Sequence, residues 1–214
     1  MVAVALSVCT SHAAIMSDPN AMSGWTGSKL FVSSPEARLY VTVEYAVYAP
    51  GQFGLSYSGQ DPSNDSQYVY AYEIFNNDPN HPRQDLPDYV RRLSVGLDGD
   101  EQPANATWVD LTPDLPLHQD PSNASFVSSG GIITSVGWNY ASDNRLIYDY
   151  PNTGGRASDV LFFTSPFGPE WDSATVSGNL FDSDTLPSPL PEPATLALLG
   201  LGAAVMLRRW KRIH

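Results

Sequence analysis

The stretch RLYVTVEYAVY, residues 38–48, decides the fold. In an extended chain its side chains alternate between two faces. One face takes Leu39, Val41, Val43, Tyr45 and Val47, and the other takes Tyr40, Thr42, Glu44 and Ala46. Apolar residues that recur with a period of two are typical of a strand with one buried face. The stretch therefore predicts a half-buried β-strand.

Six further runs are rich in β-branched and aromatic residues. They are QYVYAYEIFN (67–76), YVRRLSVGL (89–97), ATWVDL (106–111), GGIITSVGW (130–138), RLIYDY (145–150) and DVLFFTS (159–165). Turn-forming clusters of Gly, Pro, Asn and Asp separate them. No convincing amphipathic helix occurs between residues 15 and 187. We therefore expect an all-β ectodomain over residues 15–181, an antiparallel β-sandwich or jelly roll.

The charge distribution is uneven. The formal net charge is −12, and four of the 11 basic residues lie in the last seven positions. Before residue 191 the chain holds 22 acidic residues and only 7 basic ones. So acidic a surface repels phosphate backbones, which argues against nucleic-acid binding and suits a soluble extracellular protein.

The first 14 residues predict a signal peptide that is truncated at its start. The run from Val2 to Cys9 is apolar, and Ser11 and Ala13 fit the small-x-small pattern before a signal-peptidase cut. The alternative is an ordinary buried first strand. A lipid attached to Cys9 is disfavoured because Val8 is a poor fit before it. As the sole cysteine, Cys9 supports no disulfide framework.

The C-terminal tail combines a short apolar segment with charged flanks. Residues 194–207 carry no charge, and as a helix they would span roughly 21 Å. Pro191 and Pro193 precede the segment, where proline is tolerated at a helix entrance. Trp210 is placed as an interfacial aromatic. Four cations follow the segment and predict a membrane helix with a cytoplasmic C-terminus: Arg208, Arg209, Lys211 and Arg212.

The order of Pro191-Glu192-Pro193, apolar helix and basic end over residues 191–214 closely resembles the PEP-CTERM sorting signal of Gram-negative bacteria. The resemblance implies an exported precursor that is tethered in the inner membrane and processed near the motif by exosortase, a membrane transpeptidase. It further implies a final place on the outer surface or in the extracellular matrix, with links to exopolysaccharide and biofilm. Residues 182–190 are rich in Pro and Ser and predict a stalk that holds the motif clear of the ectodomain.

No catalytic constellation stands out. His81 and His118 lie in Pro- and Asp-containing loops, and neither a Gly-x-Ser-x-Gly elbow nor a His-Glu-x-x-His helix occurs. A carboxylate pair for glycoside hydrolysis would have to come from Glu44, Glu73 or Glu170. We interpret these three side chains as lying on solvent-exposed faces of the fold, and we expect no enzymatic activity.

Two weaker sites remain open. Asp98, Asp100 and Glu101 form an oxygen-rich turn that would suit Ca²⁺, although turn chemistry already explains Asp-Gly at a hairpin, and no cofactor is expected. A second such turn holds Asp61, Asn64 and Asp65. Tyr68, Tyr70 and Tyr72 share one strand face; exposed they would stack on sugar rings, but burial in the core is favoured.

Three functions follow in order of support. The first is a non-enzymatic matrix or surface component, and the second is a carbohydrate-binding module on the same anchor. The third is a glycan hydrolase.

Overall fold

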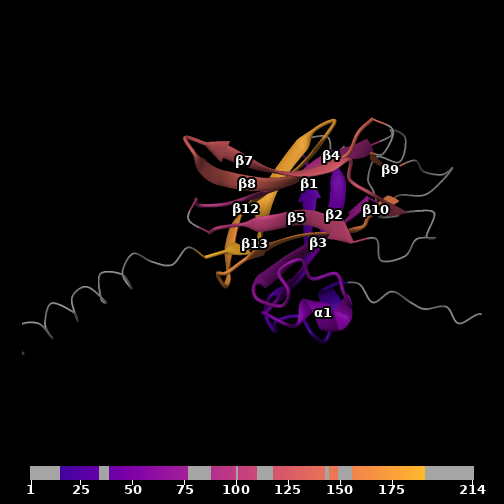
Figure 1. Cartoon of the computed structure of the whole chain (residues 1–214). Helices are drawn as coiled ribbons and strands as arrows, with labels where there is room; N and C mark the ends of the chain where they lie inside the picture. The colour runs from indigo at the N-terminus through magenta and orange to yellow at the C-terminus, as the bar shows by residue number, and fades with distance from the viewer. Residues whose placement is uncertain are drawn as a thin grey trace, which may run out of the picture.

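The computed structural model describes residues 15–33, 39–76, 88–99, 101–109, 118–142, 145–148 and 156–190. The described chain forms two β-sheets with very little helix (Figure 1), which confirms the all-β expectation. The predicted signal peptide, sorting motif, apolar segment and basic end all lie outside these residues. Among the residues that are described, no helix has the length and apolarity to cross a membrane.

The first sheet follows the order β1-β2-β3, and β3 then pairs with both β10 and β11. β11 also pairs with β5, and β10 with β6. Its strands are β1 (Thr26–Val32), β2 (Tyr40–Tyr48), β3 (Tyr68–Asn76), β5 (Ala104–Val109), β6 (His118–Gln119), β10 (Arg156–Ser158) and β11 (Val160–Ser165).

The second sheet follows the order β13-β12-β4-β8-β7, with β9 paired to β4. Its strands are β4 (Asp88–Gly96), β7 (Asn123–Ser129), β8 (Ile132–Asn139), β9 (Leu146–Tyr148), β12 (Pro169–Gly178) and β13 (Phe181–Pro189). The pairing is antiparallel throughout the described strands except between β6 and β10, which run parallel. The expectation of a purely antiparallel fold is wrong at this one short pair.

The main core lies between the two sheets. From β2 it takes the predicted face, including Val41, Val43 and Val47, and from the second sheet it takes residues such as Trp138 and Val176. Burying this apolar face is the main driving force for the fold, at roughly 25 cal/mol per Å² of apolar surface. The alternation read in residues 38–48 is therefore confirmed for the inner face.

The other face of β2 is partly exposed at Tyr40, Thr42 and Glu44 but buried at its C-terminal end, which the prediction of a half-buried strand missed. Ala46 and Tyr48 belong to a second core with Phe162 of β11. A 3-10 helix, η1 (Ile15–Ser17), and the short helix α1 (Phe53–Ser56) supply its cover. The rings of Tyr48 and Phe53 meet edge to face at 5.1 Å between centroids. Together with the main core, which buries Leu161 and Phe163 on the other face, this cover leaves β11 buried at every position.

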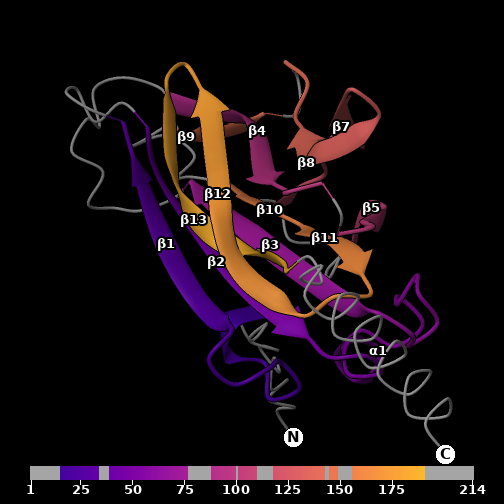
Figure 2. The ribbon, with the colours of Figure 1, turned by 90° about the vertical axis from the view of Figure 1, so that its left-hand side faces the viewer.

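Residues 182–190 are not a stalk. Phe181–Pro189 form β13, which pairs with β12 along its whole length and buries Leu186 in the main core. Prolines fit here because β13 is an edge strand, where a missing N–H leaves no neighbouring strand unpaired. The strand also lies beside β1 (Figure 2): Asp182 Oδ2 accepts the Val32 N–H at 2.7 Å, and Lys29 Nζ is 3.4 Å from Asp184 Oδ1. The folded body therefore extends to Leu190.

Candidate functional site

The tail leaves the folded body at a defined point. The Leu190 N–H donates a hydrogen bond to the Gly168 carbonyl at 2.7 Å, beside the turn that joins β11 to β12. Pro191, the first residue of the predicted sorting motif, comes next in the chain. Pro191, Glu192 and Pro193 themselves lie outside the described residues, as do Ser11, Ala13 and the four basic residues of the tail.

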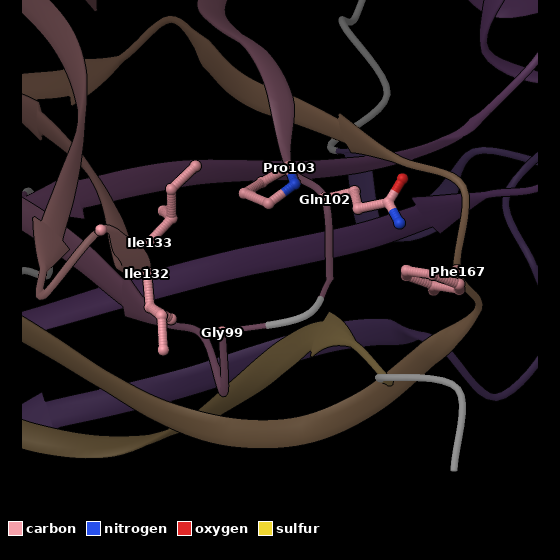
Figure 3. A pocket seen from close by; sticks show the side chains of 7 residues that line it. Gly99, Gln102, Pro103, Ile132, Ile133 and Phe167 are labelled. Carbon is pink, nitrogen blue, oxygen red and sulfur yellow. The ribbon is translucent and has the colours of Figure 1, made fainter. Parts of the chain in front are cut away.

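An open cleft of about 560 Å³ lies next to this exit. Ile132 and Ile133 project from β8 on one side, Phe167 lies on the other, and Gln102 stands between them (Figure 3). The walls carry no charged side chain and consist of Gly99, Gln102, Pro103, Gly131, Ile132, Ile133 and Phe167. Such a mixed apolar and neutral polar lining suits contact with a ligand or a partner segment.

Glu101 holds the turn that carries Gly99, one of the residues that line the cleft. Its side chain is fully buried, and its carboxylate accepts the backbone N–H groups of Asp98 and Gly99, the latter at 2.6 Å to Oε2. The Ser165 hydroxyl in turn donates to the Glu101 carbonyl at 2.5 Å. The carboxylate considered for Ca²⁺ is therefore used as a cap for its own turn. No group of three or more His, Cys, Asp or Glu side chains suited to a metal ion occurs in the described part of the chain, and Asp100 lies outside it.

Left-handed backbone conformations gather at the cleft. Gly99 has φ +109°, and a Cβ there would lie 2.4 Å from Ile132 Cγ2. Gln102 and Asn105 adopt φ +47° and +55°, which non-glycine residues rarely do. Strain of this kind persists only where surrounding contacts hold it, and it concentrates at functional sites.

The tyrosine row is part of the core. Tyr70 and Tyr72 are buried, and Tyr68 packs against the same cluster. Tyr70 stacks on Phe163 at 5.0 Å, and its hydroxyl donates to the Phe167 carbonyl at 2.7 Å. Burial raises the pKa of the Tyr70 phenol. The buried rings of Tyr70 and Tyr72 cannot stack on a sugar, and the favoured interpretation as core residues agrees with their burial, whereas Tyr68 is only partly buried.

A partly exposed aromatic cluster lies elsewhere, and no local sequence pattern indicates it. Trp171 of β12 is 45% exposed, lies 5.3 Å from the Trp25 ring and meets Tyr45 edge to face at 5.5 Å. Lys29 Nζ stands 5.7 Å from the centre of the Trp171 ring. Trp25 and Trp171 are far apart in the sequence, so no local pattern joins them. Trp171 is the exposed member of this cluster, whereas Trp25 is half-buried and Tyr45 is buried.

The predicted carboxylates Glu44 and Glu73 are brought together, while Glu170 lies apart at the start of β12. Glu44 and Glu73 are direct partners in the β2–β3 register. Glu73 is only 6% exposed, and burial raises its pKa to about 7, with Glu44 and Asp159 adding to the rise and His118 opposing it. Burial also raises the pKa of Glu44. The prediction that these side chains are exposed to solvent is wrong for Glu73, which is buried.

Asp120 and Asp159 complete an acidic group that the sequence did not indicate. The side chain of Asp120 hydrogen-bonds to Asp159, and this bond, with burial and the charge of Asp159, raises the pKa of Asp120 to about 6. His118 Nδ1 lies 3.7 Å from Asp159 Oδ1. His118 belongs to β6 instead of a loop; His81 lies outside the described residues. With this pKa, the Asp120 carboxyl is able to hold or release a proton near neutral pH.

Comparison with known proteins identifies the tail. Residues 189–212 match the family model of the PEP-CTERM protein-sorting motif. No curated protein and no solved structure matches the chain. The matched range begins at Pro189, the last residue of β13, so the sorting signal and the fold share residues.

Proposed function

We propose that this chain, which carries a PEP-CTERM sorting motif, is an exported protein whose β-sandwich serves as a non-enzymatic component of the bacterial surface or matrix. The match over residues 189–212 carries the proposal, because this motif marks exosortase substrates. Residues 194–207 would tether the precursor in the inner membrane, with the basic end in the cytoplasm. Processing near residues 191–193 would then pass the sandwich to the outer surface or matrix, in association with exopolysaccharide and biofilm.

The physical character of the body supports a passive role. Up to Leu190 the chain is strongly acidic, which keeps it soluble and limits association between copies. Glu44 and Glu73 are paired across β2 and β3 beside η1, and Glu73 is buried. Glu101 is occupied by backbone N–H groups. The most buried of these carboxylates therefore contribute to the folded structure.

Intact mass spectrometry tests the route. We expect the wild-type protein from the envelope and medium to begin near Ala14 and to end close to Pro191, and only when exosortase is present. Deleting residues 191–214 should abolish both processing and retention in the envelope. A species that keeps residues 208–214 in strains with and without exosortase would refute the route and leave a plain membrane anchor.

A second candidate function is glycan binding on the same anchor, favoured by the Trp25–Trp171 cluster. Each stacked ring contributes on the order of 1 kcal/mol to such contacts. Affinity electrophoresis through acidic and neutral polysaccharides should show retardation that Trp171→Ala removes. Phe181→Ala is the matched control, since Phe181 is an exposed aromatic of β13 at the far end of the same hairpin. Equal migration of wild type and Trp171→Ala in every polysaccharide would refute glycan binding through this cluster.

A further inference from the structure

The sorting motif follows the fold without a spacer. β13 ends at Pro189, Leu190 is hydrogen-bonded to Gly168, and the motif starts at residue 191. Three residues span at most about 11 Å even when fully extended. An enzyme that closes around residues 191–193 therefore meets the end of the sandwich at the same time.

The surface at this exit is the cleft. Phe167, one of its walls, directly precedes Gly168, the residue to which Leu190 is bonded. The opposite wall presents Ile132, which is 51% exposed (Figure 3). Although the body is strongly acidic, the seven lining residues are neutral. A partner element can enter here without burying an unpaired charge, which is the main penalty at an interface.

The cleft is also held in a fixed position relative to the exit. The Tyr70 hydroxyl, from the rigid core, fixes the Phe167 carbonyl at 2.7 Å. Glu101 fixes the turn at Asp98 and Gly99 through two backbone N–H groups. Binding to a preformed surface avoids the entropy of ordering loops, so even a small contact contributes to affinity.

We propose that this cleft is a docking site for the exosortase, which seats an apolar surface segment there while it reads residues 191–193. The inference rests on the proposed sorting route and adds a second recognition element to it. Binding energy from a contact remote from the reacting bond helps to position that bond for the chemical step. A flat bilayer would not fill a hollow of about 560 Å³, and anionic headgroups would repel so acidic a body.

The test is the rate at which the full-length precursor is processed in its own envelope, followed by pulse-chase. Ile132→Lys places a charge in the cleft and should slow processing by about tenfold, as expected when one well-packed interface residue is lost. Gln102→Lys, from the neighbouring wall, should act in the same direction. Val127→Lys is the matched control, because Val127 is an exposed apolar residue of the same β7–β8 hairpin outside the cleft lining and should be processed normally.

A flexible Gly/Ser spacer of about 12 residues between Leu190 and Pro191 provides the second arm. It should slow processing and remove any further effect of Ile132→Lys, because the cleft and motif can no longer be engaged together. Normal processing of Ile132→Lys, equal slowing by Val127→Lys, or an Ile132→Lys defect that persists with the spacer would overturn the docking site. The last outcome would point to the lipid surface or to misfolding. Unchanged processing after deletion of residues 191–214 would instead refute the sorting route itself.

Discussion

Glu44 and Glu73 stand directly opposite each other on β2 and β3, on the face of the first sheet that η1 and α1 cover. Oε2 of Glu44 is buried and has no hydrogen-bond partner among the described residues. Burial, with the charge of Glu44 adding to it, favours the protonated form of Glu73 and raises its pKa. The consequence is a fold whose stability depends on pH near neutrality.

The pH dependence should centre on Glu73. Its pKa is raised from 4.5 to about 7, so the folded protein holds this proton more tightly than the unfolded chain does. The free energy of unfolding should therefore fall as pH rises from about 4.5 to about 7 and change little above that. Glu73→Gln should remove this slope and stabilise the protein at pH 8 by on the order of 3 kcal/mol.

Urea unfolding of the purified mature protein across this pH range measures the effect. Asp98→Asn, which removes one exposed carboxylate, should leave the slope in place. Retention of the full slope in Glu73→Gln would show that another group, such as Glu44, His118 or Asp159, is responsible.

A second pH effect should come from the pair Asp120 and Asp159. The pKa of Asp120 is raised to about 6, chiefly by its hydrogen bond to Asp159. Above that pH Asp120 loses the proton that it donates, and its negative charge then repels that of Asp159. Asp120→Asn keeps a hydrogen-bond donor toward Asp159 at every pH. We expect a higher melting temperature than wild type at pH 8 and no difference at pH 5. Asp120→Ala, which has no donor, should lower the melting temperature at pH 5; a gain at both pH values would contradict the hydrogen bond from protonated Asp120 to Asp159.

The turn at the cleft should be sensitive to a single methyl group. In Gly99→Ala the new Cβ would meet Ile132 Cγ2 at 2.4 Å in a backbone conformation that alanine disfavours. We expect destabilisation of roughly 1–3 kcal/mol, measured by thermal or urea unfolding. Gly131→Ala is the control: it has φ +86° but open space around it, so only the backbone penalty applies. A smaller effect for Gly99→Ala than for Gly131→Ala would contradict the close approach.

Residues 182–190 should behave as part of the core. Leu186→Ala removes a fully buried side chain from the main cluster and should destabilise the protein by about 2–5 kcal/mol. Leu180→Ala, in the β12–β13 turn and 37% exposed, should lie within about 1 kcal/mol of wild type. Equal stabilities of the two variants, or ready proteolysis within residues 182–190 of the native protein, would instead support the prediction that these residues form a stalk.

The predicted fold succeeded where local periodicity determines the structure. The alternation of residues 39–47 located β2 and its inner face, and the terminal motif with its charged flanks located the sorting signal. The outer face of β2 was missed because Ile15 and Phe53, which cover it, lie in segments whose composition is typical of loops. The prolines of residues 182–190 suggested a linker. The burial of Leu186 follows from the pairing of β13 with β12, which the local sequence does not indicate.

The candidate sites depended on contacts between distant parts of the chain. Asp120 meets Asp159 because β6 pairs in parallel with β10, and no spacing along the sequence indicates this. Trp25 meets Trp171 only because β12 and β13 return beside β1. The cleft next to Leu190 likewise requires two turns and one hairpin to meet at one end of the sandwich. Patterns of period two locate strands but do not indicate which ends come together.

The edge position of β13 has a mechanical consequence for a protein held by its C-terminus. Tension on the tail enters the fold at Leu190 and runs along the axis of β13. The β12–β13 register joins nine residue pairs from Pro169↔Pro189 to Ser177↔Phe181, and antiparallel hydrogen bonds lie perpendicular to the strands. A pull along the strand therefore loads these bonds together in shear and does not open them one by one. The strand that leads into the sorting motif would therefore resist drag on a sandwich that is held by its C-terminus.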